Sequence, residues 1–123
     1  MLDLNSSRAI YLQIVDDICD KILTGELTAD SRIPSVREYA ARVEVNVNTV
    51  MRAYDYLSGL EIIYNKRGLG YFTAAGARSQ VIELRRKELF GSVARNFFRQ
   101  MSLLEITPEQ VAEMYQQFLD SKN

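Results

Sequence analysis

The sequence contains no histidine and only one cysteine, Cys19, among its 123 residues. Without histidine, the chain lacks the commonest general base and the commonest metal ligand of proteins. A single cysteine cannot form an internal disulfide, which is typical of proteins in a reducing compartment. The usual zinc sites are excluded as well. We therefore expect no metal and no other cofactor.

Long apolar stretches are also missing. No segment approaches the ~20 consecutive apolar residues of a membrane-spanning helix. The first five residues, MLDLN, lack the basic start and apolar core of a signal peptide. Hydrophobic residues still make up 47% of the chain, enough for a real core. These features predict a cytoplasmic protein without membrane contact, built as one compact domain or as a small domain with an appendage.

Charge is unevenly distributed, although the net charge is only −1. Residues 1–31 hold two basic and six acidic side chains, whereas residues 32–73 hold six basic and four acidic ones. Lysine and arginine are the groups that neutralise DNA phosphates. The positive excess therefore lies on the segment most suited to nucleic acid, and its modest size predicts weak affinity from one protomer alone.

Helix signals begin near the N-terminus. Apolar residues recur at helical spacing over residues 9–23, and Gly25 supplies a left-handed helix exit. Cys19 lies within this apolar set, so we expect a buried structural thiol rather than a reactive one. Ser35 and Glu38 form a capping-box pattern, which predicts the start of a second, short helix.

A third helix and a hairpin are expected next. Glu44 and Val45 form the turn, and Asn46 is the predicted N-cap of the third helix. The positions expected to face inward are Val47, Val50, Tyr54 and Leu57, and those expected to face outward are Asn48, Thr49 and Arg52. Two short apolar segments, residues 62–64 and 71–73, flank the glycine-rich basic segment 66–70, which predicts a hairpin with a loop at 66–70.

Two short helices joined by a tight turn and followed by a basic hairpin suit a protein that places one helix in a DNA major groove and a loop on the adjacent backbone. Asparagine can pair with adenine, threonine can bond bases or phosphates, and arginine can bind guanine or phosphate. Hairpin glycines let the backbone approach phosphates closely. The candidate DNA-binding residues are Arg37, Asn46, Asn48, Thr49, Arg52, Lys66, Arg67, Gly68 and Gly70.

Simpler interpretations of these residues exist. Taken singly, the asparagines and the threonine serve as caps and turn formers, and Arg37 as a solvated surface side chain. A nucleotide-binding loop is disfavoured, because the chain has no Gly-Lys-Ser/Thr and the glycine-rich segment joins two strands. Asp16 and Asp17 are adjacent on a helix and point in different directions, so they form no acid–base pair. We therefore predict that the protein is not an enzyme.

The C-terminal part carries two further amphipathic patterns. A small segment, residues 74–77, resembles a linker, and a long helical stripe then starts at Val81. Thr107 and Gln110 form a second capping box. Such stripes on a small domain more often pack against a second copy than enclose a ligand pocket, which remains the alternative. The expected dimer-interface residues are Leu89, Phe90, Val93, Phe97, Met101, Met114, Tyr115 and Phe118.

Several motifs between Ile10 and Thr73 resemble, in order and spacing, the GntR family of bacterial transcription regulators. They are IYLQIV at 10–15, RIPSVRE at 32–38, NTVMRAY at 48–54, then Leu57, Gly59 and the Gly68-x-Gly70 pair. The short two-helix tail is similar in length and pattern to the YtrA-type subgroup, in which no large effector domain follows. The resemblance implies a mostly α fold: a winged helix-turn-helix over residues 1–75 and a homodimerising helical hairpin over 76–123.

The resemblance also implies functional positions. It aligns Arg37, Asn46, Asn48, Thr49 and the hairpin residues 66–70 with places that contact DNA in the family, and Arg52 belongs to the same motif. Val47 and Met51 stand where many relatives carry basic residues, so a different base preference and a smaller phosphate contribution are expected. The lack of histidine agrees with the absence of the metal-binding sensor domain that larger members carry.

Together these observations predict a cytoplasmic, sequence-specific transcriptional regulator, a repressor that binds a pseudo-palindromic operator as a homodimer. Half-sites are expected about one helical turn (~34 Å) apart, or a multiple of it. The partners are double-stranded DNA and a second copy, with a small-molecule effector left open. The chief alternative is a protein-interaction module that has the same shape without DNA binding, which the negative total charge favours. A third is a ligand-gated regulator with its pocket in the tail.

Overall fold

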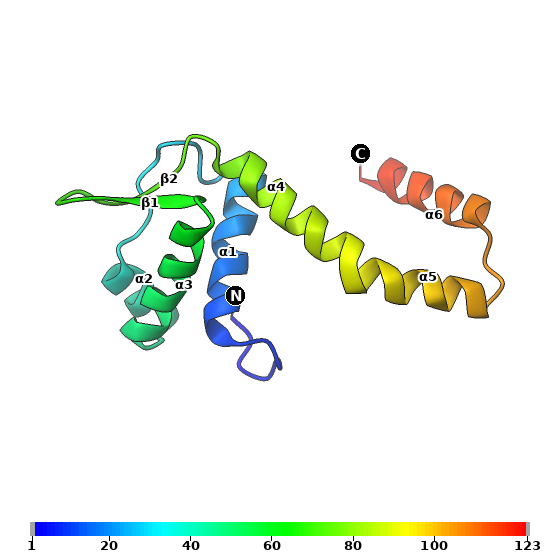
Figure 1. Ribbon diagram of the computed structural model, residues 1–123, viewed down its shortest axis with the longest axis horizontal. Coiled ribbons are helices and arrows are strands. Elements are labelled where there is room, and N and C mark those ends of the chain that lie inside the picture. The colour runs from blue at the N-terminus through cyan, green and yellow to red at the C-terminus, as the bar shows by residue number, and fades with distance from the viewer. Residues whose placement is uncertain (1, 123) are drawn as a thin grey trace. The chain divides into compact units, whose positions relative to one another are not determined.

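The computed structural model describes residues 2–122, and the chain divides into two compact units, residues up to Leu84 and residues from Arg85 on. The division falls within a helix, later than the boundary expected after residue 75. The first unit contains α1 (Ile10–Thr24), α2 (Val36–Val43), α3 (Val47–Gly59), β1 (Ile63–Lys66), β2 (Gly70–Thr73) and the first turns of α4 (Ala77–Glu88), as Figure 1 shows. This mostly α arrangement with a two-stranded antiparallel hairpin is the winged helix expected from the sequence.

The helices of the first unit begin and end at the predicted signals. Ser35 Oγ accepts a hydrogen bond from the Glu38 N–H at 3.1 Å, and the Glu38 carboxylate accepts from the Ser35 N–H at 3.0 Å. The backbone hydrogen bond from Ser35 lowers the pKa of Glu38 below its ordinary value. Gly25 ends α1 in the left-handed region with φ of 86°. The tight turn between α2 and α3 depends on Glu44, which adopts the left-handed region at φ 56°.

One hydrophobic core is shared by α1, α2, α3, the hairpin and the start of α4. Its fully buried members include Ile14, Cys19, Ile33, Val50, Ala53, Tyr54, Leu57, Ile62, Ile63 and Val81. Cys19 is buried, as predicted. The prediction that Val47 faces inward is wrong: it is 38% exposed, because it is the first residue of α3 and lies at the edge of this core. Val81 packs in this core with Ala77, so α4 begins where a linker was expected.

Two buried tyrosine hydroxyls join the helices through polar contacts. The Tyr39 hydroxyl donates to Asp17 Oδ2 at 2.7 Å and thereby links α2 to α1. The Tyr54 hydroxyl donates to the carbonyl of Pro34 at 2.6 Å and links α3 to the segment before α2. Burial raises the pKa of both tyrosines well above the ordinary value. Both therefore remain protonated donors throughout the physiological pH range.

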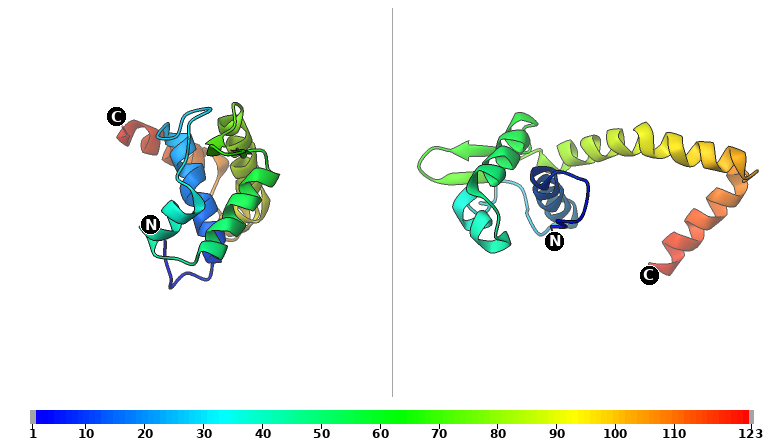
Figure 2. Two further views of the ribbon diagram at one scale, coloured as in Figure 1. Left: turned by 90° about the vertical axis from the view of Figure 1, so that its left-hand side faces the viewer. Right: turned by 90° about the horizontal axis from the view of Figure 1, so that it is seen from below.

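The hairpin is longer than the sequence indicated. β1 pairs with β2 from Ile63 opposite Thr73 to Lys66 opposite Gly70, so the loop comprises only residues 67–69. The Leu69 N–H donates to the Lys66 carbonyl at 2.8 Å and closes this loop. Arg32 adds an isolated bridge to Phe72 at the outer edge of β2. The tip of the hairpin extends away from α1, α2 and α3 (Figures 1 and 2).

The second unit consists of the end of α4, the π-helical turn η1 (Leu89–Val93), α5 (Ala94–Leu103) and α6 (Pro108–Ser121). Gly91, at φ −84° and ψ −121°, interrupts the helical path, so the long stripe expected as one helix is broken there. Thr107 and Gln110 form the predicted capping box at the start of α6. None of the residues in η1, α5 and α6 is buried. No helix within residues 2–122 is long and apolar enough to cross a bilayer.

Thr73 provides a test of the packing that holds the hairpin. This side chain is fully buried; its hydroxyl accepts from the Ser31 N–H at 3.0 Å and donates to the Thr28 carbonyl. Thr73→Val keeps the shape but leaves these two backbone groups without their partner. We expect a loss of about 1–3 kcal/mol in the free energy of unfolding, measured by urea denaturation. The exposed control Thr24→Val should change it by less than about 0.5 kcal/mol, and equal effects from both variants would contradict the assignment.

Candidate nucleic-acid interface

The N-terminal half of α3 presents a polar face to solvent. Val50, Ala53 and Tyr54 are completely buried and fix the rotation of the helix about its axis. The opposite side carries Asn48 and Arg52, both exposed, and Thr49 at its edge is half-buried. These three predicted DNA-binding residues are therefore brought together on one surface. We call the N-terminal half of α3 the recognition helix, residues 47–52.

Asn46 and Arg37 lie beside this helix. The Asn46 side-chain oxygen accepts from the Asn48 N–H at 2.7 Å, so it caps the helix as predicted. Only the amide NH₂ group of Asn46 remains to donate to a ligand. Arg37 is the second residue of α2 and is exposed.

Arg52 has a defined position on α1. Its Cζ atom lies 3.9 Å from the centroid of the Tyr11 ring, a cation–π contact. Tyr11 in turn packs edge-on against Tyr56, with ring centroids 6.3 Å apart. The same guanidinium helps to line an open hollow of about 400 Å³ between the start of α1 and the recognition helix. Arg52 is thus held at one side of the recognition helix.

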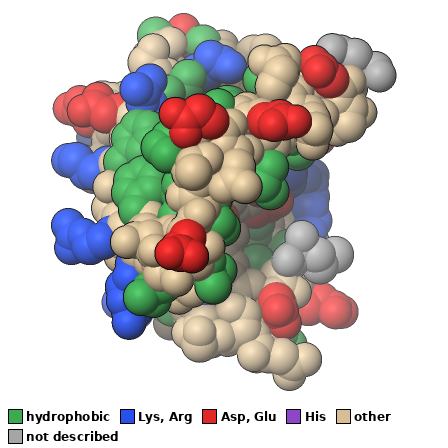
Figure 3. Space-filling view, turned by 90° about the vertical axis from the view of Figure 1, so that its right-hand side faces the viewer, with side chains coloured by type: hydrophobic (Ala, Val, Ile, Leu, Met, Phe, Trp, Pro, Cys, Tyr) green, Lys and Arg blue, Asp and Glu red, His purple; other side chains and the backbone are tan. Residues whose placement is uncertain are grey.

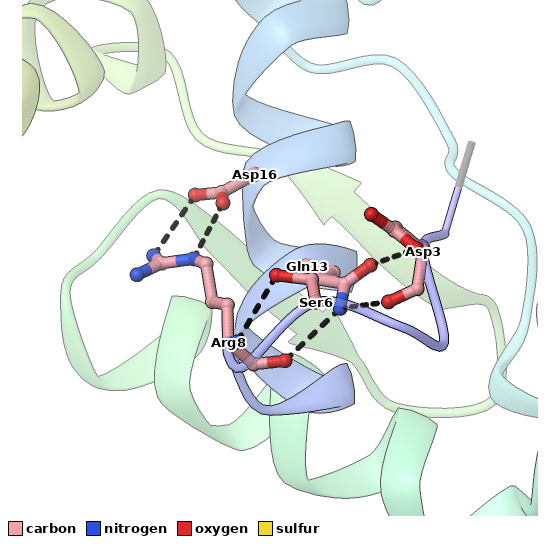
Figure 4. A network of polar contacts seen from close by, with 5 residues as sticks. All are labelled: Asp3, Ser6, Arg8, Gln13 and Asp16. Atoms are coloured by element: carbon pink, nitrogen blue, oxygen red, sulfur yellow. Dashed lines mark hydrogen bonds and ion pairs between the residues drawn. The ribbon is translucent and has the colours of Figure 1, made fainter.

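The segment that precedes α1 is held against that helix by a network of polar contacts, which Figure 4 shows. The Gln13 amide group donates to the carbonyls of Asp3 and Arg8, at 2.8 and 3.0 Å. Arg8 Nε also donates to Asp16 Oδ2 at 2.7 Å. These contacts hold residues 3–8 at the start of α1 and keep the acidic face of that helix engaged with a basic side chain.

The hairpin carries the basic residues predicted for a wing, and we use that name for residues 66–70. Arg67 and Gly68 are exposed in its loop, and the Lys66 ammonium lies 5.1 Å from the centroid of the Phe72 ring. Gly68 and Gly70 have φ angles of +80° and +109°, which residues other than glycine rarely adopt. The sequence had predicted this loop as irregular, but Lys66 and Gly70 belong to the strands.

Arg32 connects the wing to α2. Its Nε donates to the Leu69 carbonyl at 3.3 Å, and its terminal nitrogen lies 3.3 Å from Glu38 Oε1. Tyr71 at the base of the wing reaches the recognition helix, where its hydroxyl lies 4.0 Å from Met51 Sδ. These contacts position the wing relative to both helices of the helix-turn-helix.

Tyr11, Arg32 and Tyr71 contact the recognition helix or the wing, and the sequence analysis did not single them out. No local pattern marks them, because each acts through a partner at least 20 positions away or on another element. Tyr11 and Arg32 do lie within the IYLQIV and RIPSVRE motifs, which is the signal that could have directed attention to them.

Seven of the eight predicted dimer residues are exposed on the second unit, and the eighth, Met101, is half-buried. Phe90, Phe97, Met114 and Phe118 are at least half exposed. In Figure 3 hydrophobic side chains gather in a patch that both basic and acidic side chains border. Exposed apolar area of this kind on a small protein marks an interaction surface.

Three helices, an outward polar recognition helix and a basic wing define the winged helix-turn-helix class of DNA-binding proteins. The chain belongs to the gntR family of bacterial regulatory proteins, whose family model matches residues 10–72. It is therefore a transcriptional regulator and not an enzyme, as the sequence predicted.

Individual relatives agree with this assignment. The HTH-type transcriptional regulator YhcF of Bacillus subtilis is 35% identical over 115 residues, which cover 94% of this chain and 93% of the relative. The HTH-type transcriptional repressor YtrA of Bacillus subtilis is 35% identical over 82 residues, 67% of this chain and 63% of the relative. The crystal structure of a GntR-family regulator from Bacteroides thetaiotaomicron has 49% identity and a TM-score of 0.82, and covers 93% of this chain and 100% of its own. The expected similarity to the YtrA type is confirmed.

The two wing glycines provide a test of the wing geometry. An added Cβ at Gly70 would meet Arg32 Nε at 3.4 Å with φ at +109°, whereas at Gly68 it would meet nothing within 4 Å at φ +80°. We expect Gly70→Ala to destabilise the protein by about 1–3 kcal/mol in thermal unfolding. Gly68→Asn should be tolerated, because asparagine adopts the left-handed region more readily. A larger effect at Gly68 than at Gly70 would contradict this geometry.

Proposed function

We propose that two copies of this chain bind a pseudo-palindromic operator and repress transcription from it. In this proposal the recognition helix of each copy enters a major groove and the wing contacts the adjacent backbone. The half-sites lie about one helical turn (~34 Å) apart, or a multiple of it. The protein acts in the cytoplasm, where its DNA target lies.

The observation that carries the proposal is the outward face of α3. Asn48 and Arg52 are exposed on a helix whose other side is completely buried, so the core holds them in solvent as a fixed set. Asparagine and arginine are the side chains that pair bidentately with adenine and guanine edges. The exposed basic side chains Arg37, Lys66 and Arg67 supply the phosphate contacts in this proposal.

The exposed apolar residues of the second unit support a dimer formed through the C-terminal tail, proposed as residues 76–123. Burying an exposed apolar stripe against a second copy is the common solution for a small protein with two amphipathic helices. Joining two DNA-binding units raises the effective concentration of the second unit once the first has bound. Dimerisation therefore offsets the small positive charge of each recognition segment. Repression is proposed because the similar protein YtrA is a repressor.

Arg67→Ala tests the wing contact. If Arg67 binds a phosphate, its loss should weaken binding to all DNA sequences alike and reduce the slope of log K against log salt by about one ion. The binding constant is measured by fluorescence anisotropy at several salt concentrations, on the duplex obtained by unbiased selection of bound DNA. Glu61 is exposed two residues before β1, and Glu61→Gln should leave the slope unchanged or slightly steeper. An unchanged slope in Arg67→Ala would remove the wing contact from the proposal.

Phe97→Asp and Phe118→Asp test the dimer. Both side chains are at least half exposed, so the changes should leave folding intact but place a charge in the proposed interface. Light scattering should report a dimer for the natural sequence and a monomer for each variant. Ser102→Asp adds the same charge to another face of α5 and should remain dimeric. If both phenylalanine variants remained dimeric, the interface would have to lie elsewhere.

A further inference from the structure

Two apolar side chains lie on the recognition helix, one at its first residue and one a turn later. Val47 and Met51 are 38% and 39% exposed, although both are hydrophobic. They are four positions apart in the sequence and therefore occupy neighbouring positions on one side of the helix. Asn48 lies next to them on the outward face. The face proposed to enter the major groove is thus part apolar.

These side chains are not part of the protein core. The inward side of α3 is completed by Val50, Ala53, Tyr54 and Leu57, each with no exposed surface. Met51 has a contact on the wing side, where its sulfur lies 4.0 Å from the Tyr71 hydroxyl. That contact orients the thioether beside the wing and leaves more than a third of Met51 accessible.

The chemistry of the major groove limits what such side chains can recognise. Base edges there present hydrogen-bond donors and acceptors, and the only methyl group among the four standard bases is the C5-methyl of thymine. Covering a donor or acceptor with an aliphatic side chain leaves that polar group without a partner, which is costly. Valine and methionine at the groove floor are therefore best matched to thymine methyl groups.

We propose that Val47 and Met51 contact thymine methyl groups in the operator. They thereby make A·T pairs the preferred pairs at two positions of each half-site, beside the base contacted by Asn48. Asparagine favours adenine through its N6 and N7 atoms, so all three side chains select the same kind of base pair. This inference rests on the proposed function, because it assigns the specificity of the same DNA surface.

Replacing single thymines by deoxyuridine tests the inference directly. Deoxyuridine keeps every hydrogen-bonding group and removes only the methyl. In the selected duplex, the natural protein should lose affinity about fourfold at each contacted thymine, the effect of burying one methyl-sized apolar group. The affinities are measured by anisotropy titration, one substituted position at a time.

Measuring protein variants on the same deoxyuridine duplexes shows which side chain contacts which methyl group. Val47→Ala and Met51→Ala should each abolish the thymine-to-deoxyuridine difference at one position and leave it unchanged at the other. Asn48→Ala is the matched control: it should weaken binding but preserve both differences. Both hydrophobic residues are exposed, so thermal unfolding should confirm that the variants fold.

The outcomes separate the inference from the function on which it rests. If the natural protein binds every deoxyuridine duplex as tightly as the parent duplex, the inference is overturned and DNA binding stands. It is also overturned if the difference persists in both Val47→Ala and Met51→Ala, because another group or the shape of the DNA then detects the methyl. If selection returns no bound DNA at low salt, the proposed function fails and the inference fails with it.

Discussion

The burial of Tyr54 is the interaction on which the DNA-binding unit depends. This side chain is fully buried at the centre of α3, and its hydroxyl donates to the Pro34 carbonyl at 2.6 Å. Its ring packs edge-on against Tyr39 of α2 and against Tyr71 of β2 at the base of the wing, with centroids 6.3 and 5.0 Å away. One residue therefore sets the positions of α2, α3 and the base of the wing. The outward direction of Asn48 and Arg52 is a consequence of that packing.

The two units expose different kinds of surface, one mainly polar and the other apolar. In the first unit the apolar residues are gathered in a core, and a polar face with a basic wing is left outside. In the second unit the apolar residues of η1, α5 and α6 remain outside, so this part of the chain lacks a core of its own in one copy. A core that is missing in the protomer is what a second copy can supply. The proposed dimerisation would therefore cover the apolar residues of the second unit and leave the polar face of the first unit free for DNA.

Local signals in the sequence were sufficient for much of the fold. The capping boxes at Ser35 and Thr107, and the helix exit at Gly25, depend on residues within one turn of each other, and all three lie where they were predicted. The burial of Cys19 followed from helical periodicity alone. The order of the GntR motifs gave the family, because their spacing extends over more than half of the chain.

Features that depend on neighbours in space could not be predicted in this way. Val47 has the helical spacing of a core residue, but it lies at the edge of the core and remains 38% exposed. Lys66 belongs to a strand because it pairs with Gly70, and the composition of the loop does not show that register. The stacking of Arg52 on Tyr11 joins two helices that are distant in sequence. The helix is broken at Gly91 because this residue has non-helical backbone angles, which the spacing of the apolar residues did not indicate.

The central claim is that the exposed face of the recognition helix is the surface that meets DNA. The most direct measurement is the change in the backbone amide NMR signals of the protein when the duplex obtained by selection is added. Our account predicts the largest changes between Asn46 and Arg52 and in the wing, with little change along the acidic side of α1. Changes concentrated on α1, with the recognition helix unaffected, would contradict it.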